Sequence, residues 1–145
     1  MSAWRCAKGY WRAWRQMPPA ERKLLQKMWL RLQITSLYLR FLGLKRTLAS
    51  LSKRKNRPEQ STVTPTRLGE LMLKSARYSP TRPTCLAQAV TLQCCLHDFG
   101  FHPVRLVLGW KAQAGFAAHA WVDCQGEPLL VTADELQQYV RFLER

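Results

Sequence analysis

The chain has 145 residues with 47% hydrophobic content, which suits one compact domain and excludes wholesale disorder. Its formal net charge of +14 at pH 7 is concentrated in residues 1–60, where 15 Lys and Arg face two acids, whereas residues 61–145 carry eight against seven. No run reaches the ~18 apolar residues of a membrane span, and the first residues lack the apolar core of a secretory signal.

The front of the chain predicts one long amphipathic helix, or two helices with a break near Gly43. It starts at "MPPAE" (Met17–Glu21), where prolines fit the first turn and the acid favours the positive end of the helix dipole. Apolar residues then recur at three- and four-residue intervals from Leu24 to Leu51. One face is mixed (Leu24, Met28, Arg31, Thr35, Tyr38), and another is almost purely apolar (Leu30, Ile34, Leu37, Phe41, Leu44). We expect the purely apolar face to pack on the rest of the protein, because an exposed stripe of this kind would promote aggregation.

The positive charge peaks at "KRKNR" (Lys53–Arg57), within a polar segment, Ser52–Pro65, that we interpret as an exposed linker. We therefore divide the chain into a basic helical region with its linker, residues 1–60, and a following domain, residues 61–145. The basic side chains are either solvated or meet an anionic partner, such as an acidic protein or an anionic membrane surface.

The following domain alternates helical and strand patterns, which predicts an α+β fold. Helical spacing returns over Thr66–Tyr78 and over Cys85–Phe99, where Gly100 supplies the helix end. Alternating patterns predict strands at Pro103–Trp110 and Phe116–Cys124, separated by the turn "KAQAG", and Gln125-Gly126 predicts a hairpin turn into "EPLLV". A capping box at Thr132–Glu135 predicts a last helix from Ala133 to about Leu143.

The five cysteines differ in their expected chemistry. An odd number fits poorly with a disulfide framework, so we expect a soluble, cytoplasmic protein. Cys85 falls in the first helical turn, where the dipole and free backbone N–H groups stabilise a thiolate. The others (Cys6, Cys94, Cys95, Cys124) are interpreted as small buried hydrophobes. Their spacing matches no metal site, and His97 and His102 are too isolated to complete one, so no metal or cofactor is expected.

His119 is the candidate partner of Cys85. It lies on a predicted strand, where Trp121 and Asp123 share its face. A cysteine at a helix start with a histidine on a following strand is a recurring solution for thiol catalysis, in which the thiolate attacks a carbonyl and the imidazole protonates the leaving amine. Sequence spacing alone does not establish that the two residues meet. His97 and His102, at a helix end and a turn, are interpreted as solvated.

The combination of "PTCL" (Pro83–Leu86), Gly100, the strand end Leu108-Gly109 and "HAWVD" (His119–Asp123) resembles a known family. It is similar to the transglutaminase-like cysteine peptidases of lasso-peptide biosynthesis, over roughly residues 64–145. The resemblance implies a papain-like or transglutaminase-like fold, with Cys85 as nucleophile and His119 as base.

The resemblance also implies a third catalytic residue, an aspartate about a dozen residues past the histidine. This chain departs from that pattern, since Val131 stands there and Asp134 is the nearest downstream acid. We assign Asp134 as the orienting residue. A backbone carbonyl or Thr132 remains the alternative.

The resemblance implies an enzyme that removes the leader from a ribosomally made lasso-peptide precursor. The front segment lacks a leader-binding fold, which suggests a free-standing form that works with a separate leader-binding protein and a lasso cyclase. Two alternatives are an acyl transferase that uses the same acyl-enzyme with an amine acceptor, and a non-enzymatic nucleic-acid binder that uses the basic, tryptophan-rich front. Nucleic acid is not the expected partner, because charge alone indicates it weakly and no recognised binding motif is present.

Overall fold

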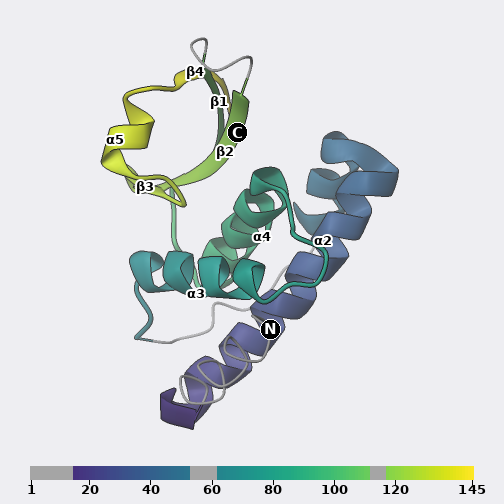
Figure 1. The fold of residues 1–145 in the computed structure, drawn as a ribbon, viewed down its shortest axis with the longest axis vertical. Coiled ribbons are helices and arrows are strands. Elements are labelled where there is room, and N and C mark those ends of the chain that lie inside the picture. The colour runs from purple at the N-terminus through teal and green to yellow at the C-terminus, as the bar shows by residue number, and fades with distance from the viewer. Residues whose placement is uncertain (1–14, 53–61, 112–116) are drawn as a thin grey trace, which may run out of the picture.

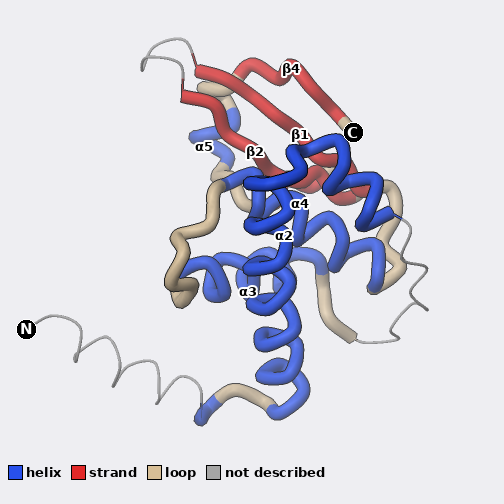
Figure 2. Tube along the Cα trace, turned by 90° about the vertical axis from the view of Figure 1, so that its right-hand side faces the viewer, coloured by secondary structure: helices blue, strands red, loops and turns tan. Residues whose placement is uncertain are grey.

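A computed structural model describes residues 15–52, 62–111 and 117–145. Its helices and strands form three layers (Figure 1): a small sheet, the central helix α4 (Cys85–Asp98), and a pair of outer helices. Those outer helices are α2 (Pro19–Ser52) and α3 (Pro65–Arg77), and both contact α4. Figure 2 shows the strands gathered on one side of the molecule and the long helices on the other.

Helix α2 begins at the expected prolines and is interrupted at Gly43, whose φ of 72° and ψ of 171° are not helical. The break near Gly43 is therefore confirmed, and a glycine adopts this positive φ without steric cost.

The expectation that the purely apolar face of α2 packs on the domain is wrong. Leu30, Ile34, Leu37 and Phe41 are exposed, and only Leu44, beyond the kink, packs against the core. The buried face is instead formed by Leu25, Met28, Leu32 and Thr35. The physical reason is that the mixed face combines apolar contacts with polar partners: Arg31 on this side bonds to Asp98 of α4, so that its charge is compensated.

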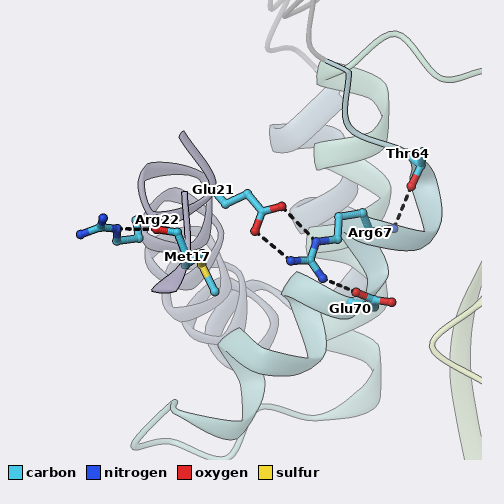
Figure 3. A network of polar contacts seen from close by, with 6 residues as sticks. All are labelled: Met17, Glu21, Arg22, Thr64, Arg67 and Glu70. Carbon is cyan, nitrogen blue, oxygen red and sulfur yellow. Dashed lines mark hydrogen bonds and ion pairs between the residues drawn. The ribbon is translucent and has the colours of Figure 1, made fainter. Parts of the chain in front are cut away.

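Helix α3 confirms the predicted helical spacing of Thr66–Tyr78 and is capped by Thr64, whose side chain accepts a hydrogen bond from the Arg67 N–H. Arg67 joins α3 to α2 (Figure 3): its guanidinium binds both carboxylate oxygens of Glu21, at 3.1 and 2.8 Å, and also reaches Glu70. Such a two-point contact fixes orientation as well as distance. The front helix is thereby tied to the domain by polar contacts in addition to apolar packing.

Helix α4 is the core of the molecule. The predicted inward stripe is confirmed, since Ala89, Leu92 and Leu96 are completely buried and Cys85 and Phe99 pack partly buried against the core cluster. The helix ends at Asp98, followed by Gly100 with a φ of 81°. A helix contacted on opposite sides by α2 and by strands has little freedom to move, so its first residue is held rigidly.

The sheet contains four antiparallel strands in the order β3-β2-β1-β4. Their bounds are β1 Val104–Lys111, β2 Ala117–Cys124, β3 Glu127–Leu129 and β4 Val140–Glu144. The strands predicted on either side of "KAQAG" are confirmed as β1 and β2, and "EPLLV" contributes the short β3.

The predicted last helix is wrong beyond its first turn. Helix α5 covers only Ala133–Leu136, and β4 follows and pairs with β1. The capping box is present, but it satisfies only the first backbone groups of a helix. The free edge of β1 offers a full ladder of hydrogen bonds to a segment containing Val140 and Phe142, two residues that favour strands.

Three parts of the sequence analysis fall outside the described residues: most of the linker, the turn "KAQAG" from residue 112 onward, and the surroundings of Cys6. The proposed division near residue 60 falls among residues 53–61, outside the described ranges, and stays a prediction.

Candidate active site

Cys85 is the first residue of α4. Thr84 caps the helix, and its side chain accepts a hydrogen bond from the Ala87 N–H at 3.2 Å. The thiol is half-buried, so it combines the positive end of a helix with access to solvent.

His119 of β2 lies against this thiol. A hydrogen bond between the two side chains is the largest influence lowering the pKa of Cys85, against the opposing effect of burial. The backbone N–H groups of Ala120 and Leu86 also bond to the sulfur and lower its pKa further. The same contact with Cys85 is the largest influence raising the pKa of His119. Both shifts favour a thiolate beside an imidazolium.

The far side of the imidazole meets a backbone carbonyl. His119 Nε2 lies 3.3 Å from the Leu130 oxygen, and because a carbonyl only accepts, Nε2 carries the proton in this contact. Leu130 has a φ of 70°, which is unfavourable for a leucine. Such backbone strain is often found where a group must be aimed at a functional site. The orienting contact is thus a carbonyl, one of the alternatives left open by the sequence.

The structure does not bring Asp134 to the imidazole. Asp134 is exposed in the first turn of α5, and within the described residues its carboxylate has no hydrogen bond or ion pair with His119. Thr132 is occupied by the capping box, since its hydroxyl donates to the Glu135 carboxylate at 2.9 Å and accepts from the Glu135 N–H. Glu135 is the acid whose charge raises the pKa of His119, as the smallest of several influences.

Two aromatic side chains pack beside His119. Tyr139 stacks at 5.5 Å between ring centroids and Trp121 at 6.3 Å. Trp121 is completely buried, and its Nε1 has no hydrogen-bond partner among the described residues. Gly109, opposite His119 on β1, leaves the space for this ring, because a Cβ there would lie 2.6 Å from the Trp121 Cη2 atom.

Sequence reasoning missed Tyr139 and the Leu130 carbonyl. Tyr139 was assigned to a helix, although its aromatic and β-branched neighbours could have indicated a strand. No sequence signal marks one carbonyl among many, because every residue has one.

A groove of about 470 Å³ lies between α2 and the loop that precedes α4. A closed set of hydrogen bonds among Gln33, Ser79 and Thr81, at 2.8–3.0 Å, ties the loop to α2. The groove is lined by apolar side chains (Leu37, Leu39, Pro83, Leu86), by two arginines (Arg40, Arg82) and by polar residues (Gln33, Ser36, Thr81, Thr84). It ends at the two residues that flank Cys85.

The other described cysteines have a different environment. Cys95 is buried, and burial raises the pKa of its thiol to about 11. Cys124 is also buried, which raises the pKa of its thiol. Cys94 is half-buried toward the other end of α4, in a pocket that also holds His97 and His102. Of Cys85, Cys95 and Cys124, Cys85 alone has a lowered pKa.

These groups can perform nucleophilic chemistry at a carbonyl. A thiolate at a helix start supplies the nucleophile, an imidazolium beside it supplies a proton, and a carbonyl keeps the ring in place.

Comparison with protein families finds a match between residues 28–144 and the family model described as the transglutaminase-like superfamily. The matched range includes Cys85, His119, the sheet and most of α2. No curated protein and no solved structure matches the chain.

Proposed function

The chain belongs to the transglutaminase-like superfamily, and from that premise we propose that it is a cysteine peptidase that removes the leader from a ribosomally made lasso-peptide precursor. The observation that carries the proposal is the contact between the Cys85 thiol, at the start of α4, and the His119 imidazole. The motifs "PTCL" and "HAWVD", which contain these two residues, support the choice of substrate through their resemblance to the lasso-peptide peptidases.

The first half of the reaction forms an acyl-enzyme. The Cys85 thiolate attacks the scissile carbonyl carbon, and the electron pair of the C=O bond moves to oxygen. The backbone N–H of Leu86, close to the sulfur at the helix start, is the donor placed to stabilise that oxyanion. When the oxyanion collapses, the C–N bond breaks, and the imidazolium of His119 gives its proton to the departing amine.

The second half returns the enzyme to its starting state. Neutral His119 takes a proton from water, and the resulting hydroxide attacks the thioester carbonyl. The C–S bond then breaks, the released acid leaves, and Cys85 recovers its thiolate beside a protonated imidazole. The Leu130 carbonyl keeps Nε2–H in place throughout, so that the other ring nitrogen faces the sulfur.

A groove near the nucleophile supports a peptide substrate. The groove between α2 and the loop before α4 is lined by both neighbours of Cys85, and Arg40 and Arg82 favour an acidic segment within it. We propose that a separate leader-binding protein presents the precursor and that a lasso cyclase receives the released core.

Asp134 has no part in this proposal. An acid in the first turn of α5 is accounted for by the positive end of the helix dipole.

The test is reconstitution with the precursor peptide, leader-binding protein and cyclase encoded beside this gene, followed by mass spectrometry of the products. We expect one cut that separates leader from core with the wild-type chain, and an uncut precursor with Cys85→Ala. Full cleavage by Cys85→Ala would exclude the thiol mechanism. A product whose new carboxyl end is instead joined to an amine acceptor through an amide bond would identify an acyl transferase. If no short precursor and no cyclase gene lie near this gene, the lasso-peptide assignment fails while the thiol chemistry remains to be tested on other peptides.

A further inference from the structure

Helix α2 exposes a row of large apolar side chains on the side opposite its buried face. Their exposed fractions are 56% for Leu30, 41% for Ile34, 54% for Leu37 and 74% for Phe41. Tyr38 and Leu42 widen the row on one side, at 38% and 40%. We call these six residues the α2 apolar face.

The α2 apolar face is continuous along the helix. Positions 30, 34, 37 and 41 follow the alternating spacing of four and three that places side chains above one another on one face. Monomeric soluble proteins rarely expose contiguous apolar surface of more than a few hundred Å² unless it is a contact site. We therefore expect another molecule or a membrane surface to cover this face.

The charges around the face all have one sign. Glu21 is the only acid in Pro19–Ser52, and it is bound by Arg67. The exposed charged residues of α2 before, within and after the span of the face are basic: Lys23, Lys27, Arg40, Lys45 and Arg46. An apolar helix face bordered by lysine and arginine is the pattern of helices that lie in the plane of a membrane surface.

This charge pattern also decides among occupants. A second copy would bring cations against cations in either helix orientation, which is repulsive. A specific partner helix is usually positioned by flanking charges of both signs, which set register and orientation. Charges of one sign set no register, and they suit a diffuse negative surface that attracts every basic residue near it.

We infer that the α2 apolar face and its basic border bind the surface of an anionic membrane as a peripheral contact. None of the helices in the described part of the chain has the length and apolarity of a membrane span. Leu37 and Arg40 also line the groove beside Cys85, so membrane binding would place the groove at the lipid surface. The inference rests on α2 alone and does not depend on the proposed peptidase activity.

The test is sedimentation of the full chain with vesicles of phosphatidylcholine containing phosphatidylglycerol, and with vesicles of phosphatidylcholine alone. We expect binding to the anionic vesicles only, weakened as salt is raised above about 0.1 M. Leu37→Ser combined with Phe41→Ser should weaken this binding about tenfold or more, because both side chains lose their insertion into lipid. The matched control is Leu73→Ser with Phe142→Ser, two residues of the same types that are 51% and 58% exposed elsewhere on the surface and should bind as wild type.

A second pair of variants tests the charges. Lys23→Gln with Arg40→Gln should weaken binding about tenfold at low salt, whereas Lys74→Gln with Arg77→Gln on α3 removes the same charge and should have a smaller effect. Circular dichroism would check that each variant is folded. Absence of vesicle binding, equal binding to neutral vesicles, or unchanged binding by the Leu37/Phe41 variant would each overturn the inference. A wild-type chain that binds no vesicle but sediments as a dimer would point to a second copy as the occupant instead.

Discussion

Two cysteines of α4, Cys85 at its start and Cys95 near its end, have thiol pKa values that are shifted in opposite directions. At its start, Cys85 is half-buried, bonded to His119 and to backbone N–H groups, and has a lowered pKa. Three turns later, Cys95 is buried beside Arg31, and burial raises the pKa of its thiol to about 11 even though a guanidinium is in contact. The difference indicates that a helix start, a hydrogen-bonding imidazole and partial exposure together lower the pKa of a thiol, whereas one nearby cation does not offset complete burial.

The largest expected effect is a difference in cleavage rate between variants of His119, which contacts the start of α4, and of His97, which lies near its other end. His119→Ala should lower the rate of precursor cleavage by about a thousandfold or more, because it removes both the thiolate's partner and the proton donor. His97→Ala, near the Cys94–Cys95 end, should leave the rate within about twofold of wild type, since His97 is exposed and stacks on His102. Steady-state rates measured by mass spectrometry would compare the two. Equal losses in both variants would mean that the start of α4 has no special chemistry.

A smaller effect on activity is expected when the packing of Trp121 beside His119 is disturbed. Gly109→Ala would place a methyl group 2.6 Å from Trp121, and the overpacking should destabilise the fold by about 1–3 kcal/mol and lower activity. Gly69→Ala, in helix α3, is the matched control, because its Cβ would lie 3.9 Å from Leu129, an ordinary van der Waals distance. That variant should be stabilised by about 0.5–1 kcal/mol. Thermal and urea unfolding would measure both, and a Gly109→Ala chain as stable as wild type would contradict the packing account.

The smallest expected effect lies at the Cys95 end. Arg31→Met removes the contacts with Asp98 and Cys95, in a pair whose side chains are 25% and 19% exposed. We expect a loss of about 1–2 kcal/mol in the free energy of unfolding, with cleavage unchanged. Arg105→Met breaks the ion pair with Glu144, whose side chains are 62% and 40% exposed, and should lower the free energy of unfolding by under about 0.5 kcal/mol. An activity loss in Arg31→Met would show that the two ends of α4 are coupled.

Local sequence patterns predicted the two elements that carry Cys85 and His119. The spacing of apolar residues and Gly100 marked α4, and the alternation around His119 marked β2, because each pattern reflects which side of one element is buried. The same logic failed for α2. The most apolar face was expected in the core. Sequence periodicity shows only that a face is apolar, and this helix has apolar residues on both of its faces.

The missing parts of the site depend on long-range contacts. Tyr139 and β4 are placed by pairing with the free edge of β1, far away in sequence, which overrides the helical tendency after Thr132. The carbonyl that orients His119 belongs to Leu130, whose side chain type has no relation to that role. The aspartate was an expectation from the family resemblance, and although a backbone carbonyl was the alternative, the sequence could not say which one.

Alkylation of each cysteine by iodoacetamide as a function of pH, followed by mass spectrometry of the peptides, tests the central comparison most directly. We predict that Cys85 reacts first and titrates below the ordinary thiol pKa, because its pKa is lowered by the bond to His119, while Cys95 stays unreacted at neutral pH. His119→Ala should move the Cys85 profile to higher pH, since the largest lowering influence is gone. A Cys85 that titrates at the ordinary value with and without His119, or that reacts no faster than Cys95, would contradict the account.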